Sequence, residues 1–179
     1  MSDLDPAADL ADLRLLQEEL DELFALESAL ARVVSAVSAW SIEQHLAHVA
    51  LANELVLRNL KSLASGRGVL LVHGAESNPR ALALLVEGRL PRGQAAAPRM
   101  VRPPERVERA LLSQWLADGR AALAELDPRT LRENEPKIPH QLLGPLDAPR
   151  WARFAVVHTR HHLAIVREIL GEASQGSVK

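Results

Sequence analysis

Hydrophobic residues recur at steps of three and four along four long stretches of the chain, which is the spacing of helices that bury one face. In the first stretch, the apolar positions run from Leu10 through Leu30 to Val37, and Asp and Glu occupy the opposite face. Asp5 and Pro6 precede it, and this pair favours a helix start because aspartate caps the helix while proline already has a helical φ. The pattern predicts a first helix of about 30 residues, or about 45 Å.

A second helix is predicted to begin at Ser41. Ser41 and Gln44 stand three residues apart, as in a capping box, in which the hydroxyl accepts from the third amide and the glutamine reaches back to the cap. Apolar positions continue as far as Leu63, and Gly66 follows. Because glycine commonly occupies the position after a helix, we expect this helix to end at Gly66.

Two further helices are predicted in the second half of the chain. The third begins near Pro104 and continues to Leu126, after which an Asp-Pro pair ends it. The fourth covers residues 148–170, between Asp147, which can cap its start, and Gly171, which can end it.

The segment between the second and third helices is the least regular. Asn78 followed by Pro79 favours a short helix as far as about Val86, and prolines then punctuate a loop. No stretch has a convincing strand pattern, and the Pro- and Gly-bearing residues 136–145 are predicted to form a loop.

These elements predict an all-α protein, a four-helix bundle with a long connection between its second and third helices. One domain over residues 1–171 and a flexible tail over residues 172–179 account for the 179 residues.

Composition narrows the class of function. Acidic and basic side chains nearly balance, at 23 and 21, for a net charge of −2, so we expect no nucleic-acid partner. The chain has no cysteine, which excludes disulfides, thiolate ligands and a cysteine nucleophile. It shows neither a targeting signal nor an apolar run long enough to span a bilayer, so we expect a soluble cytoplasmic protein without a membrane partner.

Two histidines on the fourth predicted helix share its apolar face. His158 and His162 lie in one stripe with Trp151, Phe154 and Ile165, at offsets of three, four or seven residues, so we expect both rings to face the core. Histidines four residues apart on a helix direct two imidazoles at the same point, as in helical zinc sites.

The second predicted helix carries a matching histidine. His48 lies along one line with Gln44 and Asn59, and the leucines between them indicate that this line faces the interior of the bundle. His45 lies one turn earlier, at the margin of the same face.

Two interpretations of these histidines remain open. A buried histidine is often a neutral core residue that hydrogen bonds to its neighbours. However, each imidazole brings two polar nitrogens that a core of Leu and Ile cannot satisfy. A metal ion would bind one nitrogen of each ring while the other donates to a nearby acceptor, and three converging histidines favour this second interpretation.

Two segments resemble the DinB/YfiT-like superfamily. The first is Trp40-Ser41-Ile42 followed by His48, and the second is the segment 140–151 followed by His158-Thr-Arg-His161-His162. The resemblance implies a four-helix bundle, usually a homodimer, that binds a divalent metal. Carried over by position, it implicates His48, His158 and His162 as metal ligands, and places neither His45 nor His161 among them.

A site of three histidines would leave coordination positions for water or substrate. Imidazole ligands suit zinc, nickel, iron or copper alike, so the pattern does not identify the metal. Characterised members of the resembled superfamily include transferases and isomerases that use low-molecular-weight thiols, which implies that such a thiol is a possible cosubstrate here.

Three functions are therefore considered. The first is a metal-dependent enzyme, similar to a thiol S-transferase or a hydrolase, that acts on a small molecule. The second is a catalytically silent bundle that the metal or the histidines stabilise, and the third, which the net charge disfavours, is a stress-related DNA-binding protein. For the first, Gln44, Asn59 and His161 are candidate catalytic or substrate-contacting groups, while His140 either approaches the site or caps its own loop.

Overall fold

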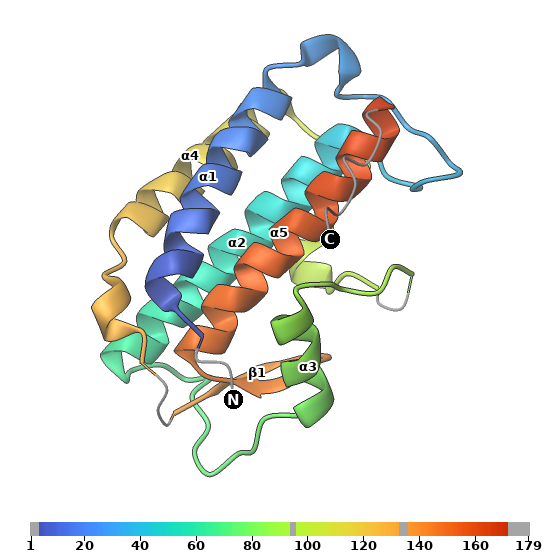
Figure 1. The fold of residues 1–179 in the computed structure, drawn as a ribbon. Coiled ribbons are helices and arrows are strands. Elements are labelled where there is room, and N and C mark those ends of the chain that lie inside the picture. The colour runs from blue at the N-terminus through green and yellow to red at the C-terminus, as the bar shows by residue number, and fades with distance from the viewer. Residues whose placement is uncertain (1–3, 94–95, 133–135, 172–179) are drawn as a thin grey trace.

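The structure is a computed structural model that describes residues 4–93, 96–132 and 136–171. Four long helices form a bundle (Figure 1), namely α1 (Pro6–Phe24), α2 (Ile42–Ser65), α4 (Arg109–Ala124) and α5 (Ala148–Leu170). Each packs on two others, so that α1 lies between α4 and α5 while α2 lies between the same two helices on the opposite side. The predicted all-α bundle is confirmed, and the predicted tail over residues 172–179 lies outside the described residues.

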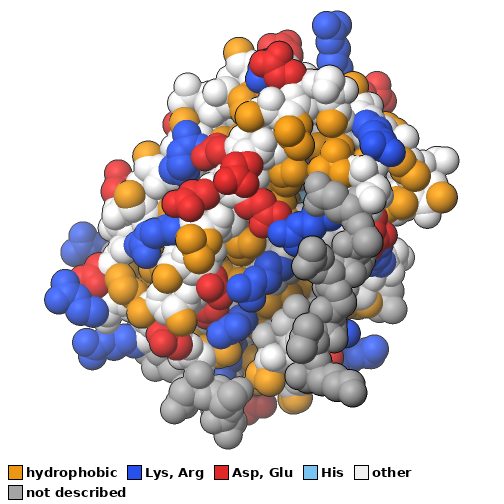
Figure 2. Space-filling view, turned by 45° about the horizontal axis from the view of Figure 1, so that its top comes forward, with side chains coloured by type: hydrophobic (Ala, Val, Ile, Leu, Met, Phe, Trp, Pro, Cys, Tyr) orange, Lys and Arg blue, Asp and Glu red, His pale blue; other side chains and the backbone are white. Residues whose placement is uncertain are grey.

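Ion pairs along the α1–α5 boundary show that these two helices run in the same direction. Asp12 pairs with Arg160 and, further along both helices, Glu19 pairs with Arg167. Figure 2 shows such acidic and basic side chains lying among one another on one face of the molecule. Helix α2 runs antiparallel to α5 (Figure 1), so the beginning of α2 lies beside the second half of α5.

The predicted start and end of α2 are confirmed. Ser41 Oγ accepts from the N–H of Gln44, while Gln44 Oε1 accepts from the N–H of Ser41, which completes the capping box. At the other end, Gly66 has a φ of 64°, the left-handed conformation that glycine adopts without strain. Helix α5 likewise has the predicted bounds, between Asp147 and Gly171.

The first helix is shorter than predicted. Helix α1 ends at Phe24, and a 3-10 turn, η1 (Glu27–Ala29), follows. The carbonyl of Leu30 accepts from the N–H of Glu43, 2.9 Å away, so the connection is held by backbone bonds to α2 instead of bonds within a helix. Leu30 is buried but Leu26 and Val33 are 46% and 49% exposed, so the apolar repeat beyond Phe24 is not a continuous buried helix face.

The connection between α2 and α4 contains the predicted short helix, α3 (Pro79–Glu87), and a 3-10 turn, η2 (Arg99–Val101). Helix α4 begins at Arg109, later than the predicted start near Pro104. The carbonyl of Pro104 accepts from Nε2 of Gln44 at 3.1 Å, so the side chain from α2 holds this part of the connection in a non-helical conformation.

A small hairpin occupies the segment that was predicted to be a loop. Strands β1 (Ile138–His140) and β2 (Gly144–Leu146) pair antiparallel, with Ile138 opposite Leu146. The expectation of no strand was therefore wrong at this point. Each strand has three residues and a central proline, so it is too short to show an alternating pattern. The indole Nε1 of Trp151 donates to the carbonyl of Ile138, and this hydrogen bond connects the hairpin to the start of α5.

The core of the bundle is made of aliphatic side chains, with leucine the most frequent. In the described part of the chain, no helix is both long and apolar enough to cross a membrane.

Candidate metal centre

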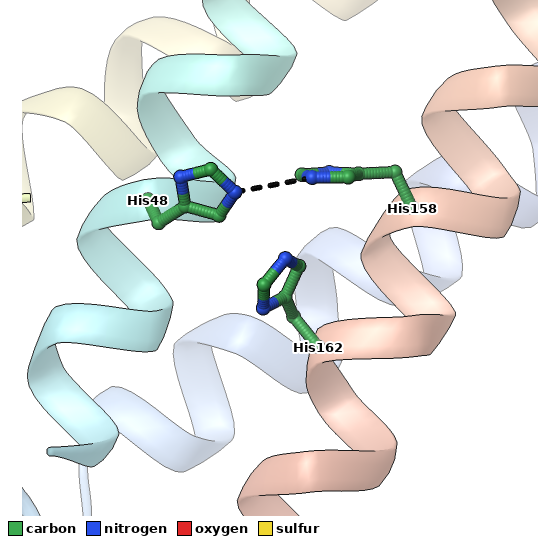
Figure 3. Close-up of side chains that lie close together, drawn as sticks. All are labelled: His48, His158 and His162. Atoms are coloured by element: carbon green, nitrogen blue, oxygen red, sulfur yellow. Dashed lines mark hydrogen bonds between the residues drawn. The ribbon is translucent and has the colours of Figure 1, made fainter. Parts of the chain in front are cut away.

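Three histidines from two antiparallel helices meet inside the bundle (Figure 3). His48 comes from the first third of α2, and His158 and His162 come from adjacent turns of α5. Each offers one ring nitrogen, and these nitrogens lie within 4.8 Å of one another. The structure thus brings together the three residues that the sequence suggested as metal ligands, in a cluster that could hold a metal ion.

The orientation of His48 is fixed by the backbone of the connection. Its Nδ1 lies 2.7 Å from the carbonyl oxygen of Val101 in η2. A carbonyl only accepts, so the ring proton of neutral His48 is on Nδ1 and its Nε2 carries a lone pair. This is the arrangement that metal-binding histidines commonly show, with one nitrogen donating to an acceptor and the other free to bind.

His48 and His158 face each other through their Nε2 atoms. The two atoms lie 3.1 Å apart, as the dashed line in Figure 3 marks. Nitrogens that bind one cation at about 2.1 Å lie about 3.0 to 3.4 Å apart at octahedral or tetrahedral angles, so this separation fits two ligands of one ion. Within the described residues, the buried Nδ1 of His158 has no hydrogen-bond partner.

His162 is held by a neighbouring histidine. Its Nδ1 lies 3.0 Å from Nδ1 of His45, and its other ring nitrogen points towards the space between His48 and His158 (Figure 3). His45 is only 2% exposed, and its Nε2 lies 2.9 Å from Oγ of Ser38. Neither Ser38 nor the contact of His45 with His162 was anticipated, because this pairing depends on the register between α2 and α5.

Burial keeps the clustered imidazoles neutral. Desolvation lowers the pKa of His48 below its usual value and lowers the pKa of both His158 and His162 well below it. The same effect lowers the pKa of His45 to about 4. Neutral imidazoles have the lone pairs that a divalent cation needs, so the rings are ready to bind a metal near neutral pH.

Aromatic side chains line the cluster. The Trp40 ring lies with its centroid 5.1 Å from that of His48 and 6.3 Å from that of His162. On the other side, the ring of Phe154 lies 5.2 Å from that of His158. These apolar walls limit water around the nitrogens and strengthen electrostatic interactions there.

The three candidate catalytic groups lie in different places. Gln44 uses its amide for the capping box and for the carbonyls of Pro104 and Glu105. Asn59 is buried but lies eleven residues beyond His48 on α2, which is about 16 Å along the helix axis. The amide of Gln44 is therefore engaged by backbone groups, and Asn59 is distant from the cluster.

His161 directly adjoins the cluster. Its ring centroid lies 5.1 Å from that of His162. It also forms a hydrogen bond with the backbone of Leu90, in the segment that follows α3. His161 therefore links that segment to α5 next to the metal centre.

His140 caps its own turn. Its Nδ1 accepts from the N–H groups of Leu142 and Leu143, at 3.2 and 3.1 Å. Its ring also packs against Phe154, with 4.5 Å between the centroids. Of the two roles considered for His140, the hydrogen bonds match the loop-capping one.

The chemistry of the cluster follows from its ligands. Three imidazoles without a carboxylate suit a transition-metal ion or zinc more than magnesium or calcium. Three protein ligands also leave at least one position for water or substrate, whereas structural zinc sites are closed by a fourth protein ligand. The arrangement is therefore that of an open metal site.

A comparison with protein families found that the model of the DinB superfamily matches residues 12–166. This match includes all three clustered histidines. No curated protein and no solved structure matched the chain.

Proposed function

Because the chain belongs to the DinB superfamily and its three clustered histidines could hold a metal, we propose that it is a metal-dependent enzyme that acts on a small molecule. The reaction class is the transfer of a low-molecular-weight thiol to an electrophile, or the hydrolysis of a small substrate. The metal is a divalent ion such as zinc, nickel or iron.

The observation that carries this proposal is the orientation of two rings. Nδ1 of His48 donates to the carbonyl of Val101, and Nδ1 of His162 is engaged by His45. In both rings the nitrogen that faces the cluster is consequently the one left for a cation, and in His48 it lies 3.1 Å from Nε2 of His158. A single hydrogen bond between His48 and His158 would not need His162 as well, whereas all three histidines bring a ring nitrogen to within 4.8 Å of one another.

A bound divalent ion would supply Lewis acidity, which lowers the pKa of water or of a thiol enough to form a nucleophile near neutral pH. His48, His158 and His162 would hold the ion by their ring nitrogens. Trp40 and Phe154 would exclude bulk water from the same space and contact the apolar part of a substrate. Since the chain has no cysteine, a reacting thiol would have to come from solution.

Metal content tests the first half of the proposal. We expect protein purified without a histidine tag and reconstituted with zinc or nickel to hold about one equivalent. His73 is exposed and lies outside the cluster, so His73→Ala serves as a matched control that retains the metal. Reconstituted protein that holds no metal, or a His162→Ala variant that holds as much as the control, would overturn the metal site.

Activity tests the second half. The metal-loaded protein is incubated with a small thiol and a small electrophile, such as glutathione and chlorodinitrobenzene, and with an activated ester. We expect turnover of one pair that disappears on chelation and returns with metal. The same rate with and without the ion across a panel of thiols and electrophiles would contradict an enzymatic role.

A second candidate is a bundle that the metal only stabilises. The positions of Gln44 and Asn59 favour it, because two of the three polar side chains expected beside a substrate are engaged elsewhere or distant. In this case, metal raises the melting temperature, and no thiol or electrophile changes the melting temperature further. We also propose a homodimer, which light scattering coupled to size-exclusion chromatography tests directly.

A further inference from the structure

A string of polar atoms leads from the metal cluster to the end of the α1–α2 connection. Nδ1 of His162 lies 3.0 Å from Nδ1 of His45, and Nε2 of His45 lies 2.9 Å from Oγ of Ser38. Ser38 is half-buried, while His45 is buried. Oγ of Ser38 also accepts from the backbone N–H of Trp40 at 3.1 Å, which holds the hydroxyl in place.

We propose that His45 is a positioning residue for the metal ligand His162, and that Ser38 in turn positions His45. In this arrangement Nε2–H of His45 donates to Ser38, Nδ1 of His45 accepts from Nδ1–H of His162, and Nε2 of His162 keeps its lone pair towards the cluster. The inference rests on the proposed metal site, because these hydrogen bonds serve to present the lone pair of His162 to a cation.

Proton counting limits the string to two arrangements. A neutral imidazole has one donor and one acceptor nitrogen, so a bond between two Nδ1 atoms requires a proton on one of them alone. If His162 carries it, Nε2 of His162 is a ligand. If His45 carries it, the proton of His162 is on Nε2 and points at His48 and His158, where it blocks a cation.

The Ser38 hydroxyl satisfies His45 in either arrangement, as an acceptor from Nε2–H in the first and as a donor to Nε2 in the second, so the choice of the first rests on the proposed metal site. With one lone pair engaged by Trp40, the hydroxyl oxygen retains a second, which can accept from Nε2–H of His45. Every nitrogen of the buried His45 is then satisfied, and no buried polar atom of that ring is left without a partner. His45 thus gives His162 what the carbonyl of Val101 gives His48, namely an acceptor for Nδ1–H.

A purely structural role for His45 makes a different prediction. If the ring only filled space beneath Trp40, a leucine would serve almost as well as a polar side chain. If it positions His162, the side chain must offer an acceptor where Nδ1 now lies. Asparagine can offer its Oδ1 at that place, so His45→Asn retains the acceptor and His45→Leu removes it.

The test measures metal affinity and tautomer in the same set of proteins. Zinc affinity is measured by competition with a chromophoric chelator at fixed pH, and the tautomer of His162 is measured by the ¹⁵N chemical shifts of its ring in metal-free protein. We expect His45→Leu to weaken zinc binding by about 10- to 100-fold. His45→Asn should recover most of that loss, and Ser38→Ala should weaken binding less than His45→Leu does.

The exposed His73 again supplies the control, since His73→Leu should leave zinc affinity unchanged. Circular dichroism shows whether His45→Leu folds. If it does not, the zinc affinities of Ser38→Ala and His45→Asn are compared with that of the unaltered protein. Equal zinc affinity in His45→Leu and the unaltered protein would overturn the positioning role while leaving the metal site standing. If the unaltered protein binds no zinc, the proposed function fails. The ¹⁵N shifts decide the positioning role separately: a proton of His162 on Nε2 overturns the proposed hydrogen bonds, and a proton on Nδ1 supports them whether or not zinc binds.

Discussion

Nδ1 of His48 and the carbonyl oxygen of Val101 lie 2.7 Å apart, so a backbone atom of η2 determines which nitrogen of this ring faces the cluster. The connection between α2 and α4 therefore orients a residue of the candidate metal centre, although it supplies none of the three clustered histidines. Because the acceptor is a main-chain group, no substitution at Val101 removes it. The role of this hydrogen bond is therefore best tested by replacing His48.

Replacing His48 should abolish tight metal binding. His48→Ala leaves two ligands on α5, and we expect the affinity for zinc or nickel to fall by at least about 100-fold, since loss of a ligand should exceed the 10- to 100-fold loss typical of its hydrogen-bond partners. Isothermal titration calorimetry measures the affinity, with His73→Ala as the matched histidine control. An affinity within threefold of the control would show that His48 is not a ligand.

Metal should stabilise the folded chain. A ligand that binds only the native state at 100 times its dissociation constant adds about 2.7 kcal/mol to the free energy of unfolding. Urea unfolding with and without zinc measures this increment, which we expect in the unaltered protein and expect to be nearly absent in His162→Ala. The same increment in both proteins would indicate that the ion binds elsewhere.

The parts of the fold that depend on neighbouring residues could be predicted from the sequence. The capping box of Ser41 and Gln44 is such a case, because all its atoms lie within one helical turn. The orientation of His158 and His162 towards the core is another, since it follows from helical periodicity alone. Their convergence with His48 was expected from the family resemblance together with the periodicity.

The parts that depend on tertiary contacts could not be predicted. The apolar spacing continues past Phe24, and only backbone bonds from the start of α2, such as that of Glu43 to Leu30, reveal that the helix has ended. Likewise, His45 and His162 are 117 positions apart, so their contact requires the axial register of two helices. The contact of the Gln44 amide with the backbone of Pro104 joins residues 60 positions apart and likewise depends on tertiary structure.

Acid should destabilise the protein partly through His140. Burial lowers the pKa of His140 from 6.5 to about 4, so the folded state favours the neutral ring. The associated stability is complete above pH 6.5 and is lost as the pH falls towards 4, by up to about 3 kcal/mol. His140→Asn keeps an acceptor for the turn without a titrating ring, so its unfolding free energy in chelator should fall less between pH 7 and 4. Parallel pH profiles for the two proteins would contradict this assignment.

Asp9 should show the opposite dependence on pH. Burial raises the pKa of this carboxyl from 3.8 to about 6, although Arg153 lies with its Nε 3.0 Å from the carboxylate. A raised pKa gives stability that is present below pH 3.8 and lost as the pH rises through 6, again by up to about 3 kcal/mol.

Asp9→Asn removes this titration. We therefore expect the unfolding free energy of the variant, relative to the unaltered protein, to be more favourable at pH 7 than at pH 4, because the raised pKa already includes the attraction to Arg153. Chemical denaturation at the two pH values gives the difference. A relative stability that moves the other way would mean that Arg153 outweighs desolvation and that the carboxyl is ionised throughout.

Anomalous diffraction at the absorption edge of the bound metal tests the central claim most directly. We expect crystals of the reconstituted protein to show one anomalous peak about 2.1 Å from a ring nitrogen of each of His48, His158 and His162, with a non-protein ligand completing the coordination. A peak located elsewhere, or reconstituted crystals in which the three rings contact only one another and their neighbours, would contradict it.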